Sequence, residues 1–413
     1  MTRRLRPLVA RTRIVEDALD PLTYVHPNAL VWAEGERALI GWGQTLEIAP
    51  DAGDVRFSRT ASQLEDFFGS LEIDDEVGSW GTGPLAFGSF AFDPDSSNSR
   101  VVVPSSVVGR DGQRTWVTVI GEEGAPLPRS TPSPSHPSRG IRRRTRDEDA
   151  QQWELSVARA CQAIRDGLVT KVVLAREICV EAATSFDPGR VVRRLAGRYP
   201  ECFVFSFDGW VGASPELLVR RRGLHVESTV LAGTAMRGST EHDDDAARSV
   251  LLASRKDRHE HELAVASVRD ALAPMAADLT VDGSPGVLRL NNVQHLATDV
   301  HARLASPTSV LDLVARLHPS AAVCGVPTDK ALALIRELEG LDRGRYSGPI
   351  GWTDARGDGE WAIALRCAEL DGRRARLFAG NGIVSDSDPQ AELAETELKL
   401  KPMLSALGEE VTE

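Results

Sequence analysis

A strand, a glycine turn and a helix follow one another near the end of the chain, and this stretch constrains the fold most. Residues 378–399 read FAGNGIVSDSDPQAELAETELK, with the helix expected to begin near Pro389. Proline is favoured at a first helical position, because its ring fixes φ and its missing N–H would have no partner there. The spacing places Glu392, Glu395 and Lys399 on one helix face. Such a face is either a solvated ion pair or, if other parts of the chain meet it, part of a site.

Composition limits the classes of function that the chain can have. Its 413 residues include 48 lysines and arginines against 60 aspartates and glutamates, a net charge of −12 that argues against nucleic acid or anionic lipid as a partner. No run of about 18 apolar residues predicts a membrane span, and no apolar core of a signal peptide follows Met1. Five scattered cysteines predict neither a disulfide framework nor a zinc site. We therefore expect a cytoplasmic enzyme.

The chain divides by composition into three parts, which we expect to belong to a single structural domain, 1–413. Residues 1–124 are rich in strand patterns with short helices. Residues 125–146 are rich in proline, serine and arginine and predict an exposed linker, whose arginines the acidic chain does not favour as a nucleic-acid arm. Thr145 and Glu148 form a capping box that opens the next helix. Residues 147–408 contain most of the chemical signals.

Two charged residues stand at the entries of apolar strands. Lys171 begins the strand KVVLAR, where it either protects a sheet edge or has a functional role. Glu216 follows a proline at the start of another strand, where a carboxylate is costly unless it is paired or used. Each position alone leaves both interpretations open.

Two further charges interrupt patterns that otherwise indicate packing. Glu260 lies in the middle of a long helix expected over 244–275, where it is a solvated charge or a ligand. Arg366 lies on a strand expected over 360–370, and a cation in a buried strand needs an anionic partner. Carboxylates on two helices suit a hard cation such as Mg²⁺, and a cation with a free arginine and lysine suits a small polyanion. Spacing does not show whether these residues meet.

Seven motifs, in this order, resemble those of the chorismate-utilising enzymes, and within that family the isochorismate synthases. They are KVVLAR from 171, ASPELL from 213, LAGTAMRG from 231, KDRHEH from 256, LHP from 317, FAGNGIV from 378 and ETELK from 395. They cover about residues 150–405, whereas the first 124 residues are similar only in general character. The resemblance implies an α+β fold, a large β-sandwich of two antiparallel sheets flanked by helices. It also implies chorismate as the substrate and Mg²⁺ as the only cofactor.

The resemblance further implies a role for each charged residue. Glu260 and Glu395 would hold Mg²⁺, with Glu392 close by through water. Lys171 would deprotonate a water that attacks ring carbon 2, and Glu216 would protonate the departing 4-hydroxyl. The substrate-binding residues would be Arg366, Lys399, Gly233, Gly380, Ala322 and Val323.

A few positions distinguish the subfamilies. Amine-transferring members are similar but have glutamine in place of Lys171, and aminodeoxychorismate synthases have a lysine where Ala232 stands. Salicylate synthases share Lys171 but typically have threonine in place of Ala322, so alanine favours release of isochorismate. Asn381 and Leu393 depart from the usual alanine and aromatic residue of the family pattern.

Three readings follow for the chain. Isochorismate synthase is the main one, and a salicylate synthase or another chorismate-utilising synthase is the alternative within the family. A non-catalytic protein that only binds a metal or a partner is the alternative outside it. We expect a monomer without a glutamine amidotransferase subunit. The lack of an attached carrier or lyase region favours menaquinone synthesis over siderophore synthesis.

Overall fold

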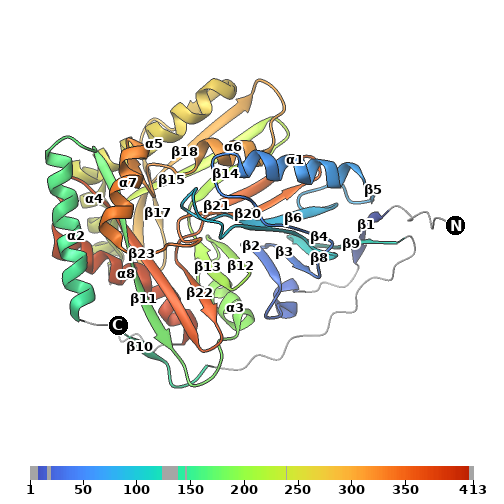
Figure 1. Cartoon of the computed structure of the whole chain (residues 1–413), viewed down its shortest axis with the longest axis horizontal. Coiled ribbons are helices and arrows are strands. Elements are labelled where there is room, and N and C mark those ends of the chain that lie inside the picture. Colours follow the sequence, from blue (N-terminus) through green and yellow to red (C-terminus); the bar gives the residue numbers. More distant parts are fainter. Residues whose placement is uncertain (1–7, 16–19, 123–137, 145–146, 239, 409–413) are drawn as a thin grey trace.

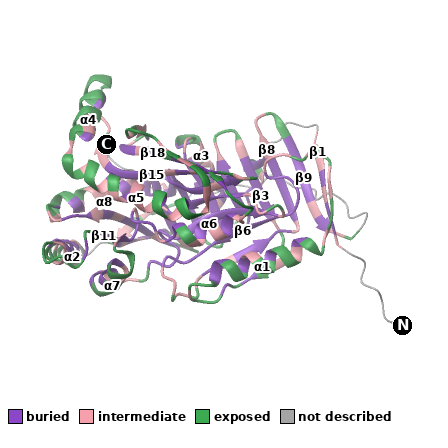
Figure 2. Ribbon diagram, turned by 90° about the horizontal axis from the view of Figure 1, so that it is seen from above, coloured by how far each residue is buried: buried purple, intermediate pink, exposed green. Residues whose placement is uncertain are grey.

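The computed structural model describes residues 8–15, 20–122, 138–144, 147–238 and 240–408, with 147–149 as backbone only. Two large sheets form its centre, and helices lie against them (Figure 1). In Figure 2 the strands are mainly buried, whereas the helices expose one side. Within the described residues no helix is long and apolar enough to cross a membrane.

Within the described ranges the first sheet has thirteen strands, and it contains most of the N-terminal strands. In spatial order its strands are β10 (Arg142–Arg144), β11 (Lys171–Glu181), β23 (Arg374–Ile383), β22 (Cys367–Asp371), β13 (Trp210–Ser214), β12 (Phe203–Phe207), β2 (Leu30–Glu34), β3 (Arg37–Trp42), β8 (Ser106–Asp111), β9 (Arg114–Gly121), β1 (Val9–Val15) and β5 (Glu72–Asp75), and β19 (Gly325–Val326) also pairs with β11.

The second sheet has ten strands in the part of the chain that the structure describes. Its order is β16 (Ala276–Val281), β18 (Val293–Leu304), β15 (His225–Met236), β14 (Leu217–Arg222), β21 (Gly359–Ile363), β20 (Pro349–Asp354), β6 (Leu85–Ser89), β7 (Arg100–Val103) and β4 (Leu46–Ile48), and β17 (Gly286–Arg289) also pairs with β18. Neighbouring strands are antiparallel except β1 and β5. The prediction of two antiparallel sheets in an α+β fold is confirmed.

Aromatic side chains fill the space between the two sheets. Trp32, Phe205 and Trp210 of the first sheet belong to one buried cluster with Phe87 and Trp352 of the second. Each large aromatic ring buries a great deal of apolar surface, so this layer contributes much of the stability of the sandwich.

Helices cover the outer faces. They are α1 (Arg56–Gly69), α2 (Asp147–Arg165), α3 (Pro188–Arg198), α4 (Glu241–Ala253), α5 (Arg255–Leu272), α6 (Val310–Leu317), α7 (Thr328–Glu339) and α8 (Pro389–Leu407), with 3₁₀ turns at Pro21–Tyr24 and Ala273–Met275. α3 and α8 share a buried cluster with the first sheet, whereas α1, α5 and α6 share one with the second. α2 and α7 lie beside β11.

Three predicted elements differ from the structure. The strand expected over 360–370 is wrong, because β21 ends at Ile363 in the second sheet and β22 begins at Cys367 in the first. Arg366 lies between them at φ +47°, a conformation that is uncommon for a residue with a side chain. The chain therefore crosses from one sheet to the other at this arginine.

The long helix expected over 244–275 is two helices. α4 ends at Ala253, and Ser254 caps α5, its side chain accepting a hydrogen bond from the backbone N–H of Asp257. The break gives α5 its own direction, and Lys256, Asp257 and Glu260 lie in its first turns.

The predicted exposed linker, 125–146, extends too far, because its last residues include a strand. Arg142–Arg144 form β10, which pairs with β11, and Arg143 makes two hydrogen bonds of 2.6 Å each with Glu397 of α8. An arginine cluster that looked solvated is thus partly structural. The capping box of Thr145 and Glu148 lies outside the described side chains.

Candidate active site

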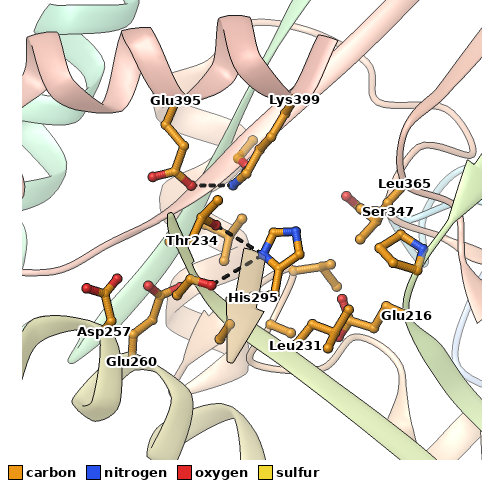
Figure 3. Close-up of a pocket in the computed structure, with 18 of the residues that line it drawn as sticks. Glu216, Leu231, Thr234, Asp257, Glu260, His295, Ser347, Leu365, Glu395 and Lys399 are labelled. Carbon is orange, nitrogen blue, oxygen red and sulfur yellow. Dashed lines mark hydrogen bonds and ion pairs between the residues drawn. The ribbon is translucent and has the colours of Figure 1, made fainter. Parts of the chain in front are cut away.

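A pocket opens where the two sheets meet the first turns of α5 and α8 (Figure 3). It holds about 720 Å³ of empty space, part of which is open to solvent. Its wall combines carboxylates, cations and glycines with few apolar groups. The charged lining residues are Glu216, Lys256, Asp257, Glu260, Arg366, Glu392, Glu395 and Lys399.

The structure brings the predicted site residues together. Ten of them line this one pocket: Glu216, Gly233, Glu260, Ala322, Val323, Arg366, Gly380, Glu392, Glu395 and Lys399. Lys171 lies just behind the wall, fully buried, with its Nζ 3.1 Å from Glu260 Oε1. It is therefore no edge charge, since β11 has β23 on one side and β19 on the other.

Glu216 is the most strongly perturbed acid of the pocket. It is almost fully buried at the entry to β14. Burial raises its pKa to about 8, although Lys171, a hydrogen bond from the backbone of Leu231, and Arg366 oppose the shift. The carboxyl group is thus mainly protonated at neutral pH, and it faces the pocket as a proton donor (Figure 3).

α8 presents its carboxylates to the pocket as the sequence predicted. Asp388 caps the helix by accepting a hydrogen bond from the backbone N–H of Ala391. Glu392 is buried and pairs with Lys256 of α5 at 2.8 Å. Glu395 pairs with Lys399 at 2.6 Å. The ion pair that the sequence allowed on this helix face therefore exists, but it lies in a pocket and not on a solvated surface.

Charge partners determine the ionisation of Glu395. Burial alone would raise its pKa, but Lys399, Lys256 and a hydrogen bond from Thr234 outweigh it and hold the pKa below the usual value. Glu395 is therefore a carboxylate at neutral pH, in contrast to Glu216.

Sequence reasoning missed His295, which orients Arg366. This buried histidine on β18 lies with its Nε2 3.2 Å from the guanidinium of Arg366. Burial and the nearby cations Arg366 and Lys399 lower its pKa to about 3, so the ring is neutral. Because Nε2 accepts from Arg366, the proton sits on Nδ1, which faces Gly233 O at 3.3 Å and the Thr234 hydroxyl at 3.2 Å. The signal available in the sequence was a single histidine within the strand-like pattern VQHLAT.

Two glycines let the strands approach the charged groups. Gly233 has φ +78° at a bulge of β15, where a side chain would meet Asp257. A Cβ at position 382 would overlap with Glu260 Oε1 and Lys171 Cε. The glycine pattern therefore follows from close packing around the carboxylates.

The donor set fits Mg²⁺ better than a transition metal. Within the described residues no three histidine, cysteine, aspartate or glutamate side chains converge on one point. Glu260 and Glu395 nevertheless face the same pocket from α5 and α8, and Mg²⁺ is usually bound through one or two carboxylates with water and substrate oxygens completing the shell. These two residues would hold the ion.

Comparison with known proteins gives the family. Residues 17–408 match the family described as chorismate binding enzyme. The chain belongs to the chorismate-binding enzymes. The family match therefore extends into the N-terminal half, well beyond the motif region.

Three relatives of this chorismate-binding enzyme carry the same activity in their names. The chain is 35% identical to the salicylate biosynthesis isochorismate synthase of Pseudomonas aeruginosa, over 98% of this chain and 91% of the relative. It is 31% identical to the isochorismate synthase MenF of Bacillus subtilis, over 98% and 94% of the two chains. A solved structure of a putative 2,3-dihydroxybenzoate-specific isochorismate synthase, DhbC from Bacillus anthracis, is 30% identical, with a TM-score of 0.79, over 94% of this chain and 98% of the other.

Proposed function

We propose that the chain is an isochorismate synthase that isomerises chorismate to isochorismate. The observation that carries the proposal is Glu216, a buried acid whose pKa is raised to about 8 and which faces the same pocket as the carboxylates on α5 and α8. The names of the relatives that match nearly the whole chain support the same reaction.

The proposed reaction needs one base and one acid. Lys171 takes a proton from water as the water oxygen bonds to ring carbon 2, and the ring double bonds shift. The bond between carbon 4 and its hydroxyl oxygen breaks, and Glu216 gives its proton to the leaving hydroxide, which departs as water. The lysine then returns its proton to solvent and Glu216 regains one, so substrate and product are isomers. General acid–base groups of this kind typically contribute about 10²–10⁴-fold each to the rate.

The charges of the pocket support Mg²⁺ as the cofactor. Asp257, Glu260, Glu392 and Glu395 outnumber the cations Lys256, Arg366 and Lys399, since Glu216 is protonated and Lys171 must be neutral to act as the base. Chorismate carries two carboxylates, and a dianion enters a partly buried pocket of negative charge only at a high cost in desolvation and repulsion. Mg²⁺ held by Glu260 and Glu395 would supply the missing positive charge.

The remaining cations would attract the carboxylates of the substrate, Lys399 by its charge alone, because its three N–H donors already have acceptors in the protein. Arg366 is fixed by His295 and by its unusual backbone conformation between the sheets. Lys399 donates a hydrogen bond to the carbonyl oxygen of Gly380. Ala322 and Val323 line the pocket without a hydroxyl group. We propose that this apolar wall favours release of isochorismate, without pyruvate elimination, and that no amidotransferase subunit is needed because the nucleophile is water.

Product analysis tests the proposal. Purified protein is incubated with chorismate and Mg²⁺, and products are separated by chromatography. Isochorismate is the expected product, in an amount that falls when a chelator removes Mg²⁺. Salicylate and pyruvate as main products would favour the salicylate synthase alternative, and the absence of turnover would favour a non-catalytic protein.

A further inference from the structure

Asn381 lies in β23 between two glycines that line the pocket, and its side chain is buried. Its Nδ2 donates to the main-chain oxygen of Glu392 at 2.7 Å and to Glu392 Oε2 at 2.8 Å. Its Oδ1 accepts from Lys399 Nζ at 2.9 Å. One amide thus contacts a carboxylate and an ammonium that are both part of the pocket wall.

The helix geometry explains how one side chain reaches both partners. Glu392 and Lys399 are seven residues apart, about 10 Å along the axis of α8. Helical side chains lean toward the N-terminus, so the long side chain of Lys399 reaches back toward Glu392. An amide is suited to the position between them because it both donates and accepts.

The contacts continue to α5. Glu392 Oε1 accepts from Lys256 Nζ at 2.8 Å, so each carboxylate oxygen of this buried side chain has a partner. Lys256 lies one helical turn before Glu260. Through Asn381, Glu392 and Lys256, β23 is connected with both helices that carry the proposed Mg²⁺ ligands.

Lys399 is also fully engaged. Its ammonium contacts Gly380 O at 2.9 Å, Asn381 Oδ1 at 2.9 Å and Glu395 Oε1 at 2.6 Å. An ammonium group has three donors, and these three acceptors fix its position.

We propose that Asn381 is a positioning residue, which holds Glu392 as an anchor between α5 and α8 and holds Lys399 at the pocket wall. Glu392 then acts through its neighbours, while Glu260 and Glu395 are the direct ligands. The identity of the metal ligands in this inference rests on the proposed function. The hydrogen bonds of Asn381 with Glu392 and Lys399 are independent of it.

Asn381→Ala tests the inference with two measurements. Calorimetric titration with Mg²⁺ alone, without chorismate, is expected to show about tenfold weaker binding, the lower end of the effect of removing an outer-shell partner, because Asn381 acts on the ligands through Glu392 and Lys399. Steady-state kinetics are expected to show a KM for chorismate raised about tenfold, with a smaller fall in kcat, as for a lost binding contact. Mg²⁺ affinity and KM within about twofold of wild type would overturn the inference.

Thr118→Ala is the matched control. Thr118 is a buried polar residue on β9, far along the first sheet, and its hydroxyl contacts that of Thr12 at 2.9 Å. This variant should lower the melting temperature and leave Mg²⁺ affinity and KM unchanged. If it changed them as Asn381→Ala does, the effect would be one of general stability, and the inference would fail.

A second variant covers the case in which the alanine variant does not fold. Asn381→Ser keeps a polar group that is too short to reach both partners, and it should show the same two losses. If wild-type protein binds Mg²⁺ but does not convert chorismate, the proposed function fails while the titration still decides the role of Asn381. Wild-type protein that binds neither Mg²⁺ nor chorismate would overturn both proposals.

Discussion

Replacing Glu216 by glutamine should separate stability from activity. Glutamine has the same shape as the protonated acid but does not ionise. Burial raises the pKa of Glu216 from 4.5 to about 8, so in the folded state the acid keeps its proton at neutral pH, whereas in the unfolded state it loses it. A raised pKa contributes stability that is fully present below pH 4.5 and is lost as the pH rises to about 8.

The size of the expected difference in unfolding free energy follows from the pH range between the unfolded and folded pKa values of Glu216. Each pH unit within it costs the wild type about 1.4 kcal/mol relative to the variant, so the difference in unfolding free energy should grow by about 2.5 kcal/mol from about pH 5.5 to about pH 7.5. Urea unfolding of both proteins at these two pH values measures it, through the shift in midpoint and the slope. Turnover of Glu216→Gln should fall about 10²–10⁴-fold at either pH.

A constant stability difference across this range would mean that Glu216 is ionised in the folded protein, and it would exclude Glu216 as a protonated acid at neutral pH. Glu47→Gln is the control. Glu47 of β4 pairs with Arg100 at 2.8 Å, and this arginine holds the pKa of the carboxyl group below its usual value. The carboxylate is therefore ionised in both states between about pH 5.5 and about pH 7.5, and its replacement should produce no growing stability difference over this range.

Three further changes test the other parts of the site. Lys171→Gln should lower turnover by about 10²-fold or more while calorimetry still shows Mg²⁺-dependent chorismate binding; unchanged turnover would remove Lys171 from its role. Glu395→Gln should weaken Mg²⁺ binding at least about tenfold in a calorimetric titration, and an unaltered titration would mean that the carboxylate is not a ligand. Gly382→Ala should abolish turnover because its Cβ displaces Glu260 and Lys171, whereas Gly197→Ala in α3, with nothing within 4 Å, should leave turnover unchanged. Equal activity of the two alanine variants would contradict the close packing seen around Gly382.

Local signals in the sequence predicted much of the fold and of the site. The cap of α8 and the face that holds Glu392, Glu395 and Lys399 follow from residue type and spacing, because both depend on neighbours in the chain. The prediction that all the candidate residues form one site came from the resemblance to the family, because spacing along the chain does not give distances between helices and strands. Ten of them line one pocket in the structure.

The remaining features depend on contacts between distant segments. Arg366 reads as part of one strand, because nothing beside it in the sequence marks a crossing between sheets. Lys171 gives no sign that it lies behind the pocket wall, since that depends on where α5 places Glu260. Asn381 looked like a departure from the family pattern, and its contacts with Glu392 and Lys399 become visible only when β23 lies beside α8.

Isotope labelling tests whether water attacks chorismate at carbon 2 while the 4-hydroxyl leaves. The protein is incubated with chorismate and Mg²⁺ in ¹⁸O-labelled water, and the product is analysed by mass spectrometry before equilibrium is reached. We expect isochorismate that carries one ¹⁸O atom, located in the hydroxyl at carbon 2. Unlabelled isochorismate would contradict it, because the hydroxyl would then have moved within the substrate.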